Sequence, residues 1–203
     1  MAKSVDFYFD YGSPTSYLAY TQMPGVAQRT GAKVNYFPIL LGGVFQATGN
    51  RSPVEIAAKG KWMQQDLQYF ADRYKVPYRW NPHFPINTLP LMRGAAYAQR
   101  EGFLIPYSDA IFKALWGDAL NVGDPAVVGK VLKDAGLDAQ KIVAATQEQA
   151  VKDALKSGTE QAVKRGIFGA PTFFVGERMF FGQDRLQYVE ELLASGVSAS
   201  RIK

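Results

Sequence analysis

A strand, a long helix and a second strand follow one another at the start of the chain, and this order constrains the fold more than any other feature. The first strand is predicted for Val5–Asp10, an aromatic and branched run. Ser13 and Pro14 predict the helix start, since serine is a favoured N-cap and proline a favoured first helical residue, and Gly31 predicts its end. With a second strand over Val34–Ile39, the segment predicts a βαβ unit with parallel strands and a right-handed crossover.

The middle of the chain shows helical periodicity. From Leu40 to about Ser157 strand signals nearly vanish, and the uncharged stretch Val34–Asn50 is predicted as a strand followed by a loop because it contains proline, asparagines and glycines. Proline is tolerated in the first turn of a helix, so three X-Pro pairs mark helix starts. The candidate helices are Pro53–Tyr74, Pro90–Glu101, Ile105–Trp116, Pro125–Ala135, Ala139–Ala145 and Gln147–Ser157.

The end of the chain returns to mixed structure. The predicted elements are a helix over Thr159–Arg165, strands over Thr172–Val175 and Met179–Phe181, and a closing amphipathic helix over Asp184–Ser195. The whole order, βαβ, then helices, then αββα, is typical of an α/β thioredoxin-like domain with a large all-helical domain inserted. Residues 1–42 and 158–203 are expected to form the discontinuous thioredoxin-like domain, and residues 43–157 the insertion.

The composition excludes several kinds of chemistry. Without cysteine, the chain cannot carry out disulfide exchange or build cysteine-ligated metal centres, and with His83 as the only histidine no metal site is predicted. The net charge of +5 favours anionic ligands, but the basic residues are scattered, which disfavours nucleic acid. Asp6 precedes any apolar stretch that could form a signal sequence, and no run reaches the roughly 20 apolar residues of a membrane helix. A soluble, cytoplasmic protein without a membrane partner is expected.

The turn between the first strand and the first helix is the first candidate site. In thioredoxin-like proteins the reactive group lies at this helix N-terminus, where free N–H groups and the helix dipole favour an anion, including a thiolate. Ser13 stands where a reactive cysteine would, and Ser16 completes a Ser-x-x-Ser pair. A hydroxyl cannot exchange disulfides, but it can donate a hydrogen bond to a thiolate that a ligand brings. The alternative is that Ser13 is only an N-cap.

Two further positions carry a structural and a functional interpretation each. Pro171 opens a strand, and a cis Ala170–Pro171 bond would turn the N–H and C=O of Ala170 outward, where an extended peptide can pair; a trans proline at a strand edge is the alternative. Asp184, at the start of the last helix, either caps that helix or meets the ammonium group of an amino-acid ligand.

Five segments together carry a family resemblance. DFYFDYGSPTSYLA, TGNRSP, AAKGKWMQQDL, IFGAPTFFV and FFGQDRL resemble the glutathione-dependent 2-hydroxychromene-2-carboxylate isomerases, which belong with the kappa-class glutathione transferases. The resemblance covers essentially the whole chain, in order. It implies an isomerase that uses glutathione as a cofactor and works as a homodimer.

The resemblance also implies roles for individual residues. Ser13 matches the catalytic serine that hydrogen-bonds the glutathione sulfur, and Ala170 matches the residue whose backbone pairs with the cysteinyl unit. Asn50 and Lys59 match contacts to the glycine end of the tripeptide, although Lys59 is equally well explained as a solvated lysine. The remaining cofactor positions, at the γ-glutamyl end, are Gly182, Gln183 and Asp184.

The implied reaction interconverts 2-hydroxychromene-2-carboxylate-type and benzylidenepyruvate-type intermediates of aromatic hydrocarbon degradation through reversible thiolate addition. Phe45 and Phe84 are the predicted substrate contacts. The chain departs from the family where residues anchor the substrate carboxylate, so the true substrate stays open; Arg51 or Arg93 could replace those anchors. Two alternatives remain: a kappa-like transferase or peroxidase that consumes glutathione, and a non-catalytic peptide-binding module at Pro171.

Overall fold

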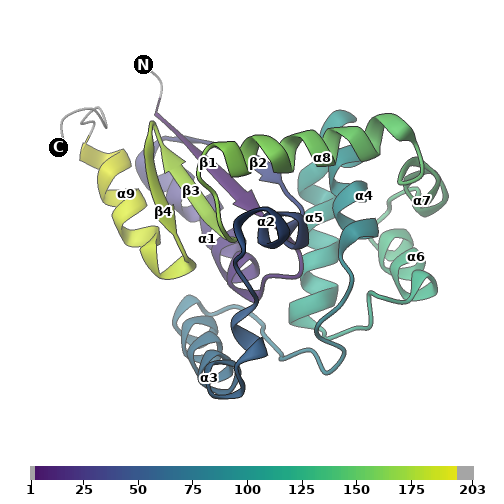
Figure 1. The fold of residues 1–203 in the computed structure, drawn as a ribbon, viewed down its shortest axis with the longest axis horizontal. Coiled ribbons are helices and arrows are strands. Elements are labelled where there is room, and N and C mark those ends of the chain that lie inside the picture. Colours follow the sequence, from purple (N-terminus) through teal and green to yellow (C-terminus); the bar gives the residue numbers. More distant parts are fainter. Residues whose placement is uncertain (1–2, 196–203) are drawn as a thin grey trace.

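The computed structural model describes residues 3–195 as a four-stranded sheet flanked by helices (Figure 1). The strands are β1 (Ser4–Phe9), β2 (Lys33–Pro38), β3 (Thr172–Val175) and β4 (Arg178–Phe181). The helices are α1 (Pro14–Thr30), α2 (Leu41–Thr48), α3 (Ala57–Tyr74), α4 (Leu89–Arg100), α5 (Leu104–Phe112), α6 (Pro125–Asp134), α7 (Ala139–Ala145), α8 (Gln149–Lys164) and α9 (Leu186–Ser195). Short 3-10 turns cover Pro53–Glu55 and Gln183–Arg185, and a π turn covers Lys113–Gly117.

The sheet confirms the predicted thioredoxin-like order. Its strand order is β2-β1-β3-β4, with β1 and β2 parallel and the other two pairs antiparallel. Both ends of α1 are as predicted. The Ser13 side chain accepts a hydrogen bond from Ser16 N, Pro14 is the first helical residue, and Gly31 ends the helix with a positive φ of 67°. The carboxyl end of β1 therefore delivers Ser13 to the N-terminus of α1, which is the position that the chemistry requires.

Side chains alternate between the two faces of the sheet. On the face covered by α1 and α9, Phe7 stacks on Phe173 with ring centroids 5.1 Å apart. On the opposite face, Tyr8 and Phe174 pack with Val44 of α2 and Ala162 of α8. Figure 1 shows α8 running along the top of the molecule from the sheet toward the helical block. Helix α3 lies at the bottom of this view and packs against α1, burying Leu67 and Ala71 in the core.

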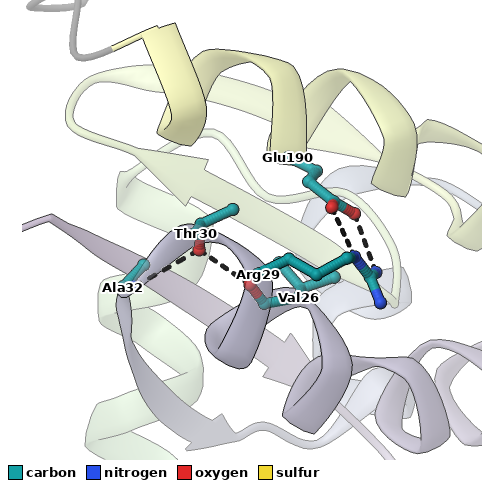
Figure 2. Close-up of polar contacts among 5 residues, drawn as sticks. All are labelled: Val26, Arg29, Thr30, Ala32 and Glu190. Atoms are coloured by element: carbon teal, nitrogen blue, oxygen red, sulfur yellow. Dashed lines mark hydrogen bonds and ion pairs between the residues drawn. The ribbon is translucent and has the colours of Figure 1, made fainter.

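Helix α9 is fastened to α1 by an ion pair as well as by packing. Arg29, in the last turn of α1, donates from Nε and Nη2 to the two carboxylate oxygens of Glu190, the second bond being 2.9 Å long (Figure 2). Thr30 donates to Val26 O and accepts from Ala32 N, closing the helix end beside this pair. Because the Arg29 side chain is exposed, the pair contributes at most about 1 kcal/mol, and the docking of α9 depends mainly on its buried leucines.

The helical block holds the turn that precedes Ser13. Trp116 is fully buried, and its Nε1 donates to Tyr11 O at 2.7 Å. The Tyr11 hydroxyl shares a hydrogen bond of 2.8 Å with Ser108 of α5, and burial raises the Tyr11 pKa well above its ordinary value. The insertion thus fixes the backbone that leads into the candidate site.

Three predictions were wrong in detail. The predicted strand at the start of Val34–Asn50 is confirmed as β2, but the predicted loop after it is wrong, because α2 occupies Leu41–Thr48 and buries Val44 in the core. Gln147–Ser157 and Thr159–Arg165 are one helix, α8, which continues through Gly158. The helix predicted from Pro53 begins at Ala57 instead, after a 3-10 turn.

The predicted domain limits fall inside helices. Residues 42 and 43 both lie in α2, and residues 157 and 158 both lie in α8. Residues 1–2 and 196–203 of the predicted thioredoxin-like domain lie outside the described part of the chain. The division into 1–42 with 158–203, and 43–157, stays a prediction.

Candidate functional site

Ser13 lies at the N-terminus of α1, 4 % exposed, with its hydroxyl in a closely spaced polar cluster. Ser13 Oγ donates to Ala170 O at 2.9 Å, accepts from Ser16 N at 3.1 Å and lies 2.8 Å from Thr15 Oγ1. Thr15 Oγ1 is also 3.4 Å from Ala170 O. The N-cap interpretation of Ser13 is confirmed, and its hydroxyl faces the residue before Pro171. Its role toward a ligand thiolate stays a prediction.

The Ala170–Pro171 bond is cis, which the sequence left open. Only part of the expected edge is available, because the Ala170 carbonyl is already occupied by the Ser13 hydroxyl. The Ala170 N–H has no hydrogen-bond partner within residues 3–195. Pro171 O in turn accepts from Gly182 N at 3.0 Å, so the cis-proline loop and the segment that opens α9 lie side by side. Three of the predicted cofactor positions, Ser13, Ala170 and Gly182, are therefore brought together around this loop.

Asn50 joins the same loop from the other side. It is exposed after α2, and its Nδ2 donates to Phe168 O at 2.8 Å, while its Oδ1 accepts from Arg51 N. Lys59 lies exposed in the first turn of α3 and makes no hydrogen bond or ion pair with any other described residue. The structure therefore ties Asn50 to the cis-proline loop and leaves the Lys59 cation free for an anionic ligand.

Gln183 and Asp184 form the third side of the site. Gln183 is 4 % exposed, yet its side-chain amide has no hydrogen-bond partner among residues 3–195; its backbone carbonyl accepts from the Tyr74 hydroxyl at 3.3 Å. A polar side chain without a partner in the protein leaves a hydrogen-bonding group available to a polar ligand or water. The prediction that Asp184 caps the last helix was wrong: Gly182 precedes the 3-10 turn, and no side chain makes a capping hydrogen bond there. Gly182 has φ 100°, and a side chain at this position would collide with the Asp184 carboxylate.

A second carboxylate faces Asp184. Burial, and then the charge of Asp184, raise the pKa of Asp66 on α3 above its ordinary value, so the two acids lie within electrostatic reach of each other. Burial also raises the pKa of Tyr74, next to them, to about 12. Asp184 also pairs with Arg185, whose Nη2 lies 3.7 Å from Asp184 Oδ2, so this acidic side of the site already attracts a cation. The sequence analysis did not single out Asp66. The one sequence feature that pointed to it was its position in AAKGKWMQQDL, one of the five segments that carry the family resemblance.

The predicted substrate residues are not brought together. Phe45 is half-buried on α2, whereas Phe84 packs on Trp80 and Trp116, each with ring centroids 5.5 Å away. Among the described residues no ring contact joins Phe45 and Phe84, and Phe45 belongs to neither buried cluster. Their role in substrate binding stays a prediction.

A buried carboxylate that sequence reasoning missed supports the Ser13 turn. Asp10 is 1 % exposed and accepts from Gly12 N at 2.8 Å and Leu41 N at 2.7 Å. Burial raises the pKa of Asp10, while these bonds and the Thr88 hydroxyl oppose the shift. Asp10 therefore links the ends of β1, the start of α1 and the start of α2 through one side chain.

A separate groove of about 820 Å³ lies between α2, α4 and α8. It contains Arg93, which the sequence offered as a substitute carboxylate anchor, together with Leu40, Leu89, Lys152 and Thr159. None of the predicted glutathione-contacting residues lines it. No group of three or more metal-binding side chains occurs within residues 3–195, and no helix there is long and apolar enough to span a membrane.

Comparison with known proteins agrees with this geometry. A model of the DsbA-like thioredoxin domain matches residues 4–194, and the chain belongs to that family. A probable DsbA oxidoreductase from Streptomyces coelicolor, 17 % identical with a TM-score of 0.73 over 99 % of this chain and 94 % of that one, shares the fold. The thioredoxin-like class predicted from element order is thereby confirmed.

More similar relatives identify the group within the family. A 2-hydroxychromene-2-carboxylate isomerase from Sphingobium xenophagum is 34 % identical over 95 % of this chain and 99 % of its own. A solved structure of a 2-hydroxychromene-2-carboxylate isomerase is 29 % identical and superposes with a TM-score of 0.86 over 95 % of both chains. Glutathione S-transferase kappa 1 from Caenorhabditis elegans is 27 % identical over 93 % of this chain and 90 % of its own. The protein is an enzyme of this isomerase and kappa-transferase group, which confirms the resemblance.

Proposed function

We propose that the protein is a glutathione-dependent isomerase that interconverts 2-hydroxychromene-2-carboxylate-type and benzylidenepyruvate-type compounds. The observation that carries the proposal is the placement of the Ser13 hydroxyl at the N-terminus of α1, against the residue before cis-Pro171, in a chain without cysteine. A helix N-terminus and a hydroxyl donor stabilise a thiolate. Since the chain has no thiol, the thiolate has to come from a ligand.

The surrounding residues fit glutathione along its whole length. The unpaired Ala170 N–H lies beside Ser13, where the cysteinyl unit would bind, and the free Lys59 cation suits the glycine carboxylate. At the other end, Asp184 and Asp66 suit the ammonium group of the γ-glutamyl unit, and the unpartnered Gln183 amide suits its carboxylate. The glycine carboxylate would thus meet a cation, and the ammonium group of the γ-glutamyl unit would meet carboxylates.

The residues of the chain bind, orient and stabilise charge. Bound as a thiolate, glutathione supplies a nucleophile that adds to a conjugated double bond, allows rotation about a carbon–carbon bond and leaves again unchanged. Ser13 Oγ–H holds the negative charge at sulfur, and the positive end of the α1 dipole favours the same charge. Asn50, Lys59, Gln183 and Asp184 fix the tripeptide, so that the sulfur stays at Ser13.

The proposal is tested by isomerisation of 2-hydroxychromene-2-carboxylate, followed by the change in its ultraviolet spectrum. We expect turnover that requires reduced glutathione, stops when S-methylglutathione replaces it, and leaves all the glutathione recoverable. Consumption of glutathione into a conjugate would instead support the kappa-like transferase. Absence of turnover and of glutathione binding would leave the peptide-binding module as the better account. The cytoplasmic location, the homodimer and the place in aromatic catabolism remain predictions.

A further inference from the structure

The proton of the Ser13 hydroxyl is already used inside the protein. Ser13 Oγ lies 2.9 Å from Ala170 O and 2.8 Å from Thr15 Oγ1, and it accepts the Ser16 N–H. A serine hydroxyl has a single proton to donate. Whether that proton points to Ala170 or to Thr15, Ser13 has to break an internal hydrogen bond before it can donate to a sulfur atom.

When the Thr15 proton points to Ser13 Oγ, breaking the bond from Ser13 to Ala170 would leave the carbonyl of a buried residue without a donor. Ala170 is only 8 % exposed, and a buried acceptor without a hydrogen bond is unfavourable. Thr15 Oγ1 lies 3.4 Å from the same oxygen, and in residues 3–195 no third side chain donates to it. Thr15 is half-buried on the first turn of α1, so its hydroxyl has room to turn.

We propose that Thr15 is a positioning residue that frees the Ser13 proton for the ligand. When the sulfur arrives, Thr15 donates to Ala170 O, and Ser13 turns its proton to the sulfur while it still accepts the Ser16 N–H. Only hydrogen bonds change partners, and each donor keeps one acceptor. The inference rests on the proposed function, because it requires a glutathione sulfur at Ser13.

The test compares Thr15→Val, which keeps the shape of the side chain without its proton, with Thr15→Ser, which keeps the hydroxyl. The pKa of the bound glutathione thiol is measured from the ultraviolet absorbance of its thiolate as the pH is varied. We expect Thr15→Val to raise this pKa by about one unit, a tenfold loss of thiolate, and Thr15→Ser to restore the wild-type value. S-methylglutathione, which has no thiol, should bind the wild type and both variants within about twofold.

The other outcomes separate the two proposals. A wild-type thiol pKa in Thr15→Val, with glutathione binding intact, overturns the role of Thr15 and leaves the proposed function standing. A Thr15→Ser variant that behaves like Thr15→Val also overturns it, because the hydroxyl would then not be the cause. If the wild type binds neither reduced glutathione nor S-methylglutathione, the proposed function fails and the inference fails with it.

Discussion

Ser13→Ala is expected to lower the turnover number at saturating glutathione about a hundredfold, because it removes the hydroxyl that the proposed function assigns to the sulfur. The variant also loses the cap of α1, which costs about 1 kcal/mol of stability and leaves the protein folded. Turnover is measured on the chromene carboxylate, and thermal unfolding is measured in parallel.

Ser16→Ala is the matched control for this experiment. It deletes a hydroxyl from the same helix, and Ser16 Oγ is buried without a hydrogen-bond partner in the described structure. The Ser16 N–H that caps onto Ser13 is kept in this variant. We expect turnover within about twofold of the wild type. Equal losses in the two variants would mean that Ser13 acts through the packing of the helix and not through its hydroxyl.

Asp10→Ala is expected to lower the free energy of unfolding by about 2 to 4 kcal/mol, which is the largest stability effect we foresee near the site. The change leaves the N–H groups of Gly12 and Leu41 without their shared acceptor, and each unpaired buried donor costs about 1–3 kcal/mol. Urea unfolding measures the loss. Asp134→Ala, which removes an exposed carboxylate of α6, should change the free energy by less than about 0.5 kcal/mol, and a similar value for Asp10→Ala would contradict the account.

The same carboxylate predicts a pH dependence of stability. Burial raises the folded-state pKa of Asp10 above its ordinary value of 3.8, so the folded protein binds this proton more readily than the unfolded chain. The Asp10 contribution to stability is therefore complete below about pH 4 and is lost as the pH rises through the raised pKa. The free energy of unfolding of the wild type, minus that of Asp10→Asn, should fall as the pH is raised from about 4 toward neutrality. A rise over this range would mean that the pKa of Asp10 is lowered on folding.

The parts of the fold that could be predicted are those with local signals. Ser13, Pro14 and Gly31 mark the ends of α1 through the hydrogen bonds and backbone angles of those residues alone. Helix α2 has no such mark: its N-cap, Leu40, makes no side-chain capping bond, and two glycines follow. It forms because Val44 packs in the core and Asp10 accepts its first N–H, and neither contact is visible in the local sequence.

The candidate site divides in the same way. Ser13 could be found because a Ser-Pro pair is a favoured helix start, and Pro171 because a proline at the start of a strand is unusual. Thr15 became a candidate only through its contact with Ala170, 155 residues away in the sequence. Asp66 became one only through its electrostatic interaction with Asp184, which lies on a different element. Such residues carry no local pattern, because folding alone brings their partners together.

The most direct test of the account is calorimetric titration of the protein with reduced glutathione at neutral pH, in two buffers of different ionisation enthalpy. We expect saturable binding to one site per chain with release of close to one proton, since the free thiol is protonated at this pH and the bound form is held as a thiolate. S-methylglutathione should bind without releasing a proton. Absence of saturable binding, or binding without proton release, would contradict a site that holds the glutathione sulfur ionised at Ser13.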